Sequence, residues 1–213
     1  MAPETPEQSR TTTPDKAARR DRPYHHGDLR RALINAALEA IAQEGPAGIS
    51  LRALARRAGV SHAAPTHHFR DKAGLLTAVA VEGFDLLADT LQETAERTGS
   101  FLELGVAYVR FALEHPSHFA VMFRPDLYHA SDPEVRRARG RSTAVLASAL
   151  ENLPNPLSTQ DRDAARLAAW SLMHGLATLW SSGSLIGYED DPLALARRVA
   201  STLSPTPLSP TSQ

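Results

Sequence analysis

The chain has 213 residues, enough for one or two compact domains with a substantial core. It contains no cysteine, which excludes disulfide bonds, thiolate nucleophiles and cysteine metal sites and fits a reducing cytoplasm. The longest apolar runs are shorter than the ~18 residues that a membrane helix needs, and the N-terminus has no apolar signal segment. We therefore expect a cytoplasmic protein without a membrane partner.

The net charge of −1 is unevenly distributed along the chain. Between Lys16 and Leu76, eleven Lys and Arg residues stand against five Asp and Glu residues, a net charge of +6, and the remainder carries −7. A basic module joined to an acidic one is typical of a DNA-binding domain with a separate partner or effector domain. Ordinary solvated surface charge is the alternative interpretation.

Taken in chain order, the predicted elements are helices between two unstructured ends. Residues 1–22 are rich in Pro, Thr and charge and predict a disordered N-terminal arm, and residues 204–213 predict a disordered tail. Apolar residues at helical spacing predict helices over 29–44, 50–57, 62–68, 72–97, 101–114, 117–123, 132–151, 159–182 and 192–203. Asp28, Asp132-Pro133 and Asp191-Pro192 are start signals, because Asp caps a helix and Pro suits its first turn. No stretch alternates like a strand, so the fold is predicted to be all-α.

The most informative segment is 48–76, where two short amphipathic patterns flank the turn Gly59-Val60-Ser61. Gly59 supplies a residue that adopts positive φ at little cost. Ser50 is expected to cap the first helix, and Ser61 or His62 to start the second. Two helices joined in this way form a helix-turn-helix, whose second helix lies in the major groove of DNA. The segment therefore predicts sequence-specific DNA binding.

The order of these elements resembles the TetR family of bacterial transcriptional regulators. The resemblance rests on Ala55-Arg56-Arg57-Ala58-Gly59-Val60-Ser61, then His68-Phe69, Lys72 and Leu75-Leu76. Tyr24-His25-His26-Gly27-Asp28-Leu29-Arg30 and Trp170-Ser171-Leu172-Met173-His174-Gly175 are similar to the signatures of a subgroup whose C-terminal domain carries a Trp-His-Gly motif. The resemblance implies a three-helix DNA-binding domain at 23–76 and a helical ligand-binding and dimerisation domain at 77–203.

The resemblance also implies which side chains meet operator DNA. Arg52 is expected to reach a base, because Arg pairs bidentately with guanine, and Lys72 is expected to meet a phosphate. The complete expected set is Ser50, Arg52, Ser61, His62, Ala63, Ala64, Thr66, His67, His68 and Lys72. Thr66 stands where the family often has Tyr; it keeps a hydroxyl but lacks the reach of Tyr toward the DNA backbone. Pro65 disfavours helical geometry at Ala64. The basic arm before Tyr24 either follows the DNA backbone or is merely solvated.

A homodimer on a palindromic operator is implied, formed through the last two long helices, 159–182 and 192–203. In the first of them Leu167, Leu172, Leu176 and Leu179 form one stripe. A small apolar or amphipathic effector is expected to release the DNA by a population shift. Its candidate pocket walls, for each of which plain core is the alternative, are Phe84, Phe101, Tyr108, Phe111, Phe119, Met122, Phe123, Trp170, Met173 and His174.

No pattern predicts catalysis or a cofactor. The sequence has no GxSxG, no phosphate-binding loop and no HExxH, so we expect no catalytic residues, no metal site and no enzyme. The adjacent pairs among the nine His, His25-His26 and His67-His68, point apart on a helix. We expect a repressor of the TetR type that an effector releases. An activator or an effector-independent DNA-binding protein is the alternative, and a small all-α enzyme is a distant third.

Overall fold

The computed structural model of the chain describes residues 26–152 and 158–202. The predicted arm and tail lie outside these residues, as do Tyr24 and His25 of the subgroup signature. Helices make up all the regular structure of the described residues, which confirms the all-α prediction. They are α1 (His26–Gly48), α2 (Leu51–Arg57), α3 (Ala64–Phe69), α4 (Lys72–Thr98), α5 (Phe101–Glu114), α6 (Pro116–Met122), α7 (Pro133–Glu151), α8 (Thr159–Ser181) and α9 (Pro192–Ser201).

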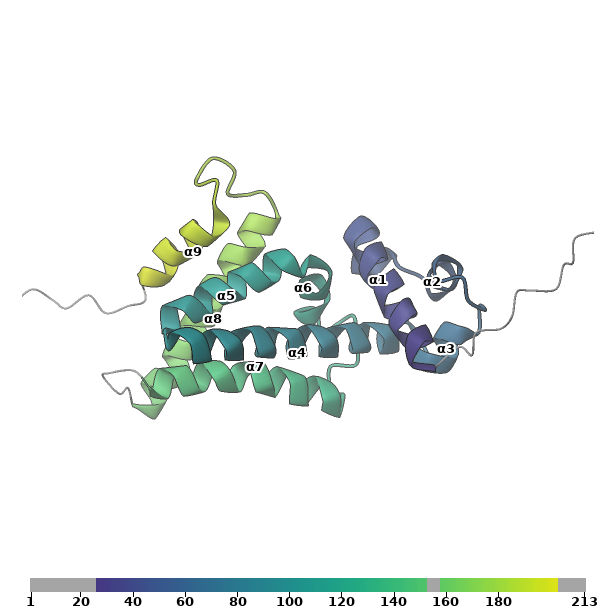
Figure 1. Cartoon of the computed structure of the whole chain (residues 1–213), viewed down its shortest axis with the longest axis horizontal. Coiled ribbons are helices and arrows are strands. Elements are labelled where there is room, and N and C mark those ends of the chain that lie inside the picture. The colour runs from purple at the N-terminus through teal and green to yellow at the C-terminus, as the bar shows by residue number, and fades with distance from the viewer. Residues whose placement is uncertain (1–25, 153–157, 203–213) are drawn as a thin grey trace, which may run out of the picture.

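The longest helix, α4, joins two groups of helices (Figure 1). Helices α1 and α3 pack against its beginning and form the head together with α2, which packs on both of them. Helices α5, α6 and α7 pack along its remaining length and form the body together with α8 and α9. Helix α7 lies beside α4, and α8 and α9 both pack against α5. The two groups of the chain therefore share α4 as a common element.

One buried core extends from the head into the body. Leu33 of α1, Leu54 of α2 and Phe69 of α3 belong to the same apolar cluster as Phe84 of α4 and Phe111 of α5. Protein interiors are packed as densely as organic crystals, so a buried helix cannot shift without moving its neighbours. A displacement of α4 within the body is therefore transmitted to the head.

Several predicted helix ends are confirmed by their capping residues. Ser50 accepts a hydrogen bond from the Ala53 N–H at 3.2 Å, and Asp132 accepts one from Glu134 at 2.8 Å. Gly45, where the first helix was expected to end, leaves helical geometry with φ at 72°. Asp28 as an N-cap is wrong, because α1 already begins at His26. An acidic residue also suits the first turn of a helix, so the same signal fits a start two residues earlier.

The second helix of the helix-turn-helix begins later than predicted. The helix expected over 62–68 is α3, which starts at Ala64. Neither Ser61 nor His62 caps it, because both lie in the preceding turn. Pro65 occupies the first turn, where its ring holds a helical φ and its missing N–H costs no hydrogen bond. Proline therefore sets the start of α3.

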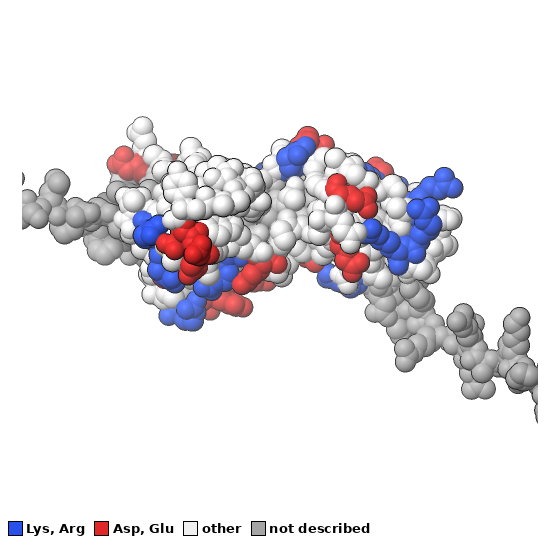
Figure 2. All heavy atoms as spheres, turned by 90° about the horizontal axis from the view of Figure 1, so that it is seen from above, with Lys and Arg blue, Asp and Glu red and all other residues white. Residues whose placement is uncertain are grey.

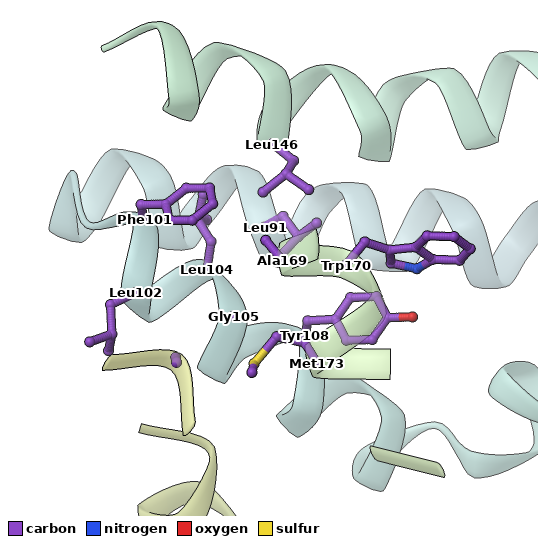
Figure 3. Close-up of a pocket in the computed structure, with 11 residues that line it drawn as sticks. Leu91, Phe101, Leu102, Leu104, Gly105, Tyr108, Leu146, Ala169, Trp170 and Met173 are labelled. Carbon is purple, nitrogen blue, oxygen red and sulfur yellow. The ribbon is translucent and has the colours of Figure 1, made fainter. Parts of the chain in front are cut away.

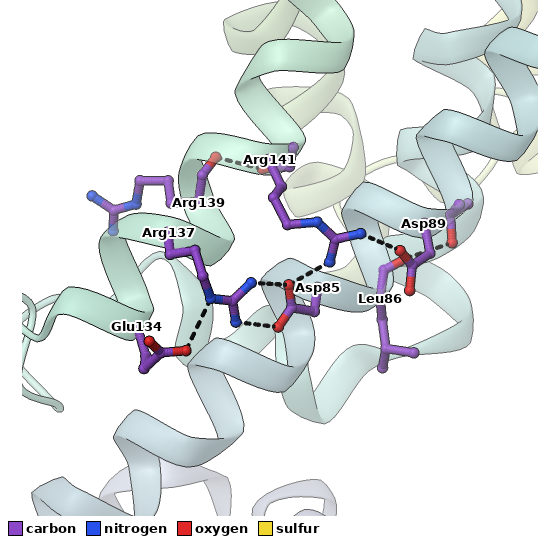
Figure 4. Close-up of polar contacts among 9 residues, drawn as sticks. Asp85, Leu86, Asp89, Glu134, Arg137, Arg139 and Arg141 are labelled. Carbon is purple, nitrogen blue, oxygen red and sulfur yellow. Dashed lines mark hydrogen bonds and ion pairs between the residues drawn. The ribbon is translucent and has the colours of Figure 1, made fainter.

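Charged side chains hold α7 in register along α4 (Figure 4). Arg137 donates to both carboxylate oxygens of Asp85, at 3.1 and 2.8 Å, and Arg141 donates to Asp85 and Asp89. The hydrogen bonds from Arg137, and then those from Arg141, hold the pKa of Asp85 below its ordinary value. Exposed ion pairs contribute only ~0–1 kcal/mol each. These pairs therefore fix the alignment of the two helices more than they stabilise the fold.

Candidate nucleic-acid interface and apolar cavity

The turn between α2 and α3 places α3 at the surface of the head. Gly59 has φ 66°, which glycine adopts without a clash from a Cβ atom. The Val60 N–H donates to the Ala55 carbonyl at 3.0 Å and closes the turn. At the end of α3 the Phe69 ring is buried, and the Arg30 guanidinium lies 5.5 Å from the ring centroid. These contacts fix one face of α3 and leave the other to solvent.

Most side chains predicted to contact DNA are accessible. The exposed ones are Ser50, Arg52, Ser61, His62, Ala63, Thr66 and His67, and the half-buried ones are Ala64, His68 and Lys72. Figure 2 shows Lys and Arg side chains gathered at the outer end of the head, whereas basic and acidic side chains lie next to each other on the body. The Lys72 ammonium donates to the Ala47 carbonyl at 2.6 Å, so a phosphate would have to share or replace this bond. The accessible face therefore carries positive charge, which the phosphates of DNA attract.

Two exposed arginines near α3, Arg56 and Arg70, are missing from the predicted DNA contacts. The position of Arg56 on the outer face of α2 is a sequence signal for it, whereas nothing in the sequence marks Arg70. Its place depends on the junction between α3 and α4. A Cβ atom on Gly74 would lie 1.9 Å from the Phe69 carbonyl oxygen, so only glycine lets α4 begin this close to α3.

A carboxylate in α4 links the head to the body. Glu82 accepts a hydrogen bond from Arg31 of α1 at 2.6 Å, and its other oxygen lies 3.3 Å from His118 Nε2 of α6. The hydrogen bond from His118, followed by the charge and hydrogen bond of Arg31, lowers the pKa of Glu82. Nearby, the Ser117 hydroxyl donates to the Leu38 carbonyl at 2.8 Å. Helix α6 of the body is thus bonded directly to α1 and α4.

The body contains an apolar cavity between α4, α5, α7, α8 and α9 (Figure 3). Its lining is Leu91, Phe101, Leu102, Leu104, Gly105, Tyr108, Leu146, Ala169, Trp170, Met173 and Ala200. Of the ten predicted pocket residues, Phe101, Tyr108, Trp170 and Met173 line it, whereas Phe84, Phe111, Phe119, Met122, Phe123 and His174 do not. Phe84, Phe111 and Met122 are instead fully buried in the core. The cavity has a volume of about 50 Å³, room for a few water molecules.

Tyr108 connects the cavity to a cluster of aromatic rings. Its hydroxyl lies 2.9 Å from His174 Nδ1, and its ring contacts those of Phe119 and Phe123. Burial raises the pKa of Tyr108 and lowers that of His174, so both groups favour their neutral forms. A neutral Tyr hydroxyl can donate to an unprotonated imidazole nitrogen. Trp170, which is 41% exposed, lines the cavity and also contacts the rings of Phe123 and His174 in this cluster.

Helix α8 presents an uncharged face to solvent. From Leu167 to Tyr188 the sequence contains no Asp, Glu, Lys or Arg. Leu167 and Leu179 are 58% and 48% exposed, but Leu176, which the sequence places in the same stripe, is only 8% exposed. The predicted stripe is therefore divided: Leu176 packs into the body, and Leu167 and Leu179 remain available to a partner.

The described residues offer neither a metal centre nor a membrane segment. Over 26–152 and 158–202, no three His, Cys, Asp or Glu side chains are grouped so that they could hold an ion. Within the same ranges, every helix is too short or too polar to cross a bilayer. The candidate functional sites are therefore the exposed surface of the head and the cavity of the body.

A basic head that exposes a short helix after a glycine turn, mounted on a helical body, defines a DNA-binding protein of the helix-turn-helix class. Comparison with known proteins gives the family. Residues 33–79 match the family described as "Bacterial regulatory proteins, tetR family", and residues 101–203 match "Tetracyclin repressor-like, C-terminal domain". The chain belongs to the TetR family, and it is a DNA-binding transcriptional regulator rather than an enzyme.

One curated relative supports the family assignment, and two solved structures show the same fold. The HTH-type transcriptional regulator BetI of Escherichia coli O127:H6 is 31% identical over 180 residues, covering 78% of this chain and 87% of that protein. A Rhodococcus sp. RHA1 protein of unknown function has a similar structure, with a TM-score of 0.73 and 35% identity over 86% of this chain and 97% of its own. The putative regulatory protein SCO4313 shares the fold, with a TM-score of 0.72 and 22% identity over 87% of this chain and 99% of its own.

Proposed function

We propose that the chain is a repressor that binds a palindromic operator as a homodimer and is released by a small-molecule effector. The observation that carries the proposal is the course of α4. Its first residue, Lys72, lies close to the end of α3, the recognition helix of the helix-turn-helix, and Leu91, further along α4, lines the apolar cavity. The helix between them spans roughly 28 Å at ~1.5 Å per residue. One rigid element thus connects the DNA-binding surface to a place where a ligand could act.

On DNA, the exposed side chains of the head divide into two groups. We assign base recognition to Arg52, His62, Ala63, Ala64 and His67, and phosphate contacts to Ser50, Thr66 and Lys72. Arg52 is the strongest candidate for a specific contact, because its guanidinium is exposed at the start of α2 and suits guanine O6 and N7. Thr66 in place of the family's frequent Tyr leaves phosphate binding more dependent on the cations.

The dimer is proposed to form through α8 and α9. One head offers little surface, and two heads related by a two-fold axis read the two halves of a palindrome. Exposed Leu167 and Leu179 lie on α8, which carries no charged residue from Leu167 to its end at Ser181, and they form the apolar patch that such an interface needs. Paired α8 and α9 helices from two subunits would make a four-helix bundle.

The effector is proposed to be a small apolar or amphipathic molecule that enters the cavity of the body. A volume of about 50 Å³ is too small for a typical ligand, so binding has to displace wall side chains such as Trp170 of α8 or Leu146 of α7. Helix α8 also belongs to the proposed dimer interface. Effector binding would therefore change the spacing of the two heads and favour a state that misfits the operator.

The finer placement within the family is part of the proposal. Trp170, His174 and Gly175 lie together on α8, which supports membership of the subgroup with the Trp-His-Gly domain. The basic head and the uncharged α8 face support a protein that works as a dimer on DNA, and we place it in a bacterial cytoplasm because the matched family is described as one of bacterial regulatory proteins. We divide the chain into a DNA-binding domain at 23–76 and a ligand-binding and dimerisation domain at 77–203, with the boundary inside α4.

The test is a binding titration against DNA from upstream of the chain's own gene, in rising salt, with the molecular mass of the complex recorded. Tight, salt-sensitive binding of one or two dimers to a palindrome is the expected result. Only weak binding that ignores sequence would contradict specific recognition by this head. Release of the DNA in a screen of apolar compounds would establish effector control, and an absence of release would leave an effector-independent regulator.

Two substitutions separate the roles of the head residues in the same assay. Arg52→Ala is expected to cost ~1–3 kcal/mol at the specific site and to relax base preference. Lys72→Ala is expected to weaken binding to all sequences and to reduce the salt slope by about one unit per head. Equal losses for Arg52→Ala on every sequence would reassign it to phosphate, and an unchanged slope for Lys72→Ala would remove it from the interface.

A further inference from the structure

The junction between α3 and α4 is a tight γ-turn around Arg70. The Asp71 N–H donates to the Phe69 carbonyl at 2.8 Å, two residues back, and Arg70 between them has φ 67° and ψ −59°. It is the only residue other than glycine with positive φ in the described part of the chain. A side chain with a Cβ atom is strained in this conformation, whereas glycine is not. The position therefore favours glycine on backbone grounds and carries arginine instead.

The conformation of Arg70 is held by the elements on both sides of it. Its own N–H donates to the Thr66 carbonyl at 2.9 Å, which completes the last turn of α3. Asp71 caps α4 by accepting a hydrogen bond from Gly74 at 2.7 Å, and Gly74 admits the Phe69 carbonyl where a Cβ atom would clash. The turn is thus fixed before any ligand is bound, and so is the point where the side chain of Arg70 leaves the backbone.

The guanidinium of Arg70 is exposed and available. Some cations of the head already have partners, since Arg31 binds Glu82, Arg57 binds Gln43 and Glu44, and Lys72 binds the Ala47 carbonyl. Like Arg52 and Arg56, Arg70 does not share this arrangement, and it alone of the three has the strained backbone. Within the residues that the structure describes, no hydrogen bond or ion pair involves the Arg70 side chain. A strained residue with a free charge, next to the recognition helix, indicates that the side chain is kept for a partner outside the subunit.

That partner is defined by the position of the residue. Helix α3 has six residues and is ~9 Å long at ~1.5 Å per residue, and the first residues of such a helix contact the base edges, so its last turn points away from them. When α3 occupies the groove, a long side chain that follows its last turn lies next to a groove wall, and this wall is sugar-phosphate backbone. An arginine offers a planar pair of donors to a phosphate.

We propose that Arg70 is a DNA-backbone contact, and that the strained turn is retained because it presents this guanidinium to a phosphate beside the groove. The proposal rests on DNA binding by the head and adds a residue to the contacts assigned above. The contact is independent of sequence, so it operates on operator and non-operator DNA alike.

The experiment measures binding of the full-length chain to two labelled duplexes, one from upstream of its own gene and one of mixed unrelated sequence. Fluorescence anisotropy is recorded from about 50 to 200 mM salt, where phosphate contacts dominate the change in affinity. Arg70→Gln keeps the strained backbone and removes the charge. We expect the slope of log affinity against log salt to fall by about 0.9 per head on both duplexes.

Two matched variants separate charge from backbone strain. Arg70→Lys retains a cation and is expected to retain most of the slope. Arg70→Gly relieves the strain, so it is expected to lose the slope as Arg70→Gln does while its melting temperature stays the same or rises. A melting temperature that falls in Arg70→Gly together with the slope would overturn the proposal, because the residue would then be structural.

The remaining outcomes are equally decisive. An unchanged slope for Arg70→Gln, beside a wild type with a steep one, would overturn the Arg70 contact and leave the proposed function intact. A loss confined to the upstream duplex would indicate a base contact and would also overturn it. A wild type that binds neither duplex in a salt-dependent way would overturn both the contact and the proposed function.

Discussion

Replacing Glu82 by Gln tests how strongly the head is tied to the body. The Glu82 carboxylate accepts a hydrogen bond from Arg31 of the head at 2.6 Å and lies 3.3 Å from His118 of the body. Glutamine keeps the size of the side chain but removes its negative charge and one of its acceptor oxygens. The variant therefore weakens both links without creating a cavity.

The two links differ in exposure and hence in strength. The Arg31 side chain is 55% exposed, so its ion pair is screened and contributes ~0.5 kcal/mol. The His118 side chain is 8% exposed, and a hydrogen bond to a charged group contributes ~1.5–3 kcal/mol. We expect Glu82→Gln to lower the free energy of unfolding by ~2 kcal/mol. For a chain of this length the melting temperature then falls by ~4–8 °C.

The effect should depend on pH in a defined direction. The hydrogen bond from His118, and then Arg31, lowers the pKa of Glu82 from its ordinary value of 4.5. A carboxylate whose pKa is lower in the folded state stabilises fully above the unfolded value, and this stabilisation is lost as the pH falls through the folded value. The difference in melting temperature between the wild type and Glu82→Gln is therefore expected to be complete at pH 7 and to disappear in acid.

The matched control is Asp163→Asn, since Asp163 is 71% exposed and, among the described residues, forms an ion pair with Arg166 alone. Its free energy of unfolding is expected to change by at most ~0.5 kcal/mol, as for other surface substitutions, so its melting temperature, measured by circular dichroism, should shift by no more than ~1–2 °C. A Glu82→Gln variant as stable at pH 7 as Asp163→Asn would refute the inferred strength of the link between head and body.

Three further outcomes follow from single contacts. Gly74→Ala places a Cβ atom 1.9 Å from a backbone carbonyl oxygen, so denaturant titration should show a loss of ~1–3 kcal/mol, with weaker DNA binding by anisotropy; wild-type values for both would contradict the close approach. Leu179→Asp should dissociate the dimer and leave the subunit folded, whereas buried Leu176→Asp should unfold it, as light scattering and circular dichroism would show; a dimeric Leu179→Asp would move the interface elsewhere. Burial lowers the pKa of His174, so below about pH 6.5 the folded state binds fewer protons than the unfolded state. As the pH falls through this range, the free energy of unfolding should therefore decrease more for the wild type than for His174→Gln.

The helices could be predicted from the sequence because their ends depend on local chemistry. Ser50 and Asp132 cap the helices that follow them, and Gly59 takes the positive φ that the turn requires. Where two local signals compete, the prediction of the start was wrong: Pro65, and not Ser61, sets the beginning of α3. A capping residue and a first-turn proline both mark a helix start, and only the structure shows which of the two decides it.

The cavity was only partly predictable, because its walls come from five helices. Phe101 and Phe84 both belong to apolar helical stripes, but Phe101 lines the cavity and Phe84 lies in the core. Helical periodicity identifies the inner face of a helix and does not say whether packing fills the space in front of it. Leu91 and Leu146 were absent from the predicted walls for the same reason, since ordinary leucines carry no signal of a nearby space.

The position of Glu82 bears on how ligand binding in the body would affect DNA binding by the head. Next to it, a Cβ atom on Gly83 would lie 2.6 Å from Met122 Sδ, so glycine lets α6 press directly on α4 at the level of the head. The cavity is small, and its wall at Leu91 belongs to the same helix α4. On the proposed mechanism, a ligand that enlarges the cavity would push on a helix that is already in contact with α6 and, through Glu82, with α1. Because the core between the cavity and the head is closely packed, the head would then move with α4.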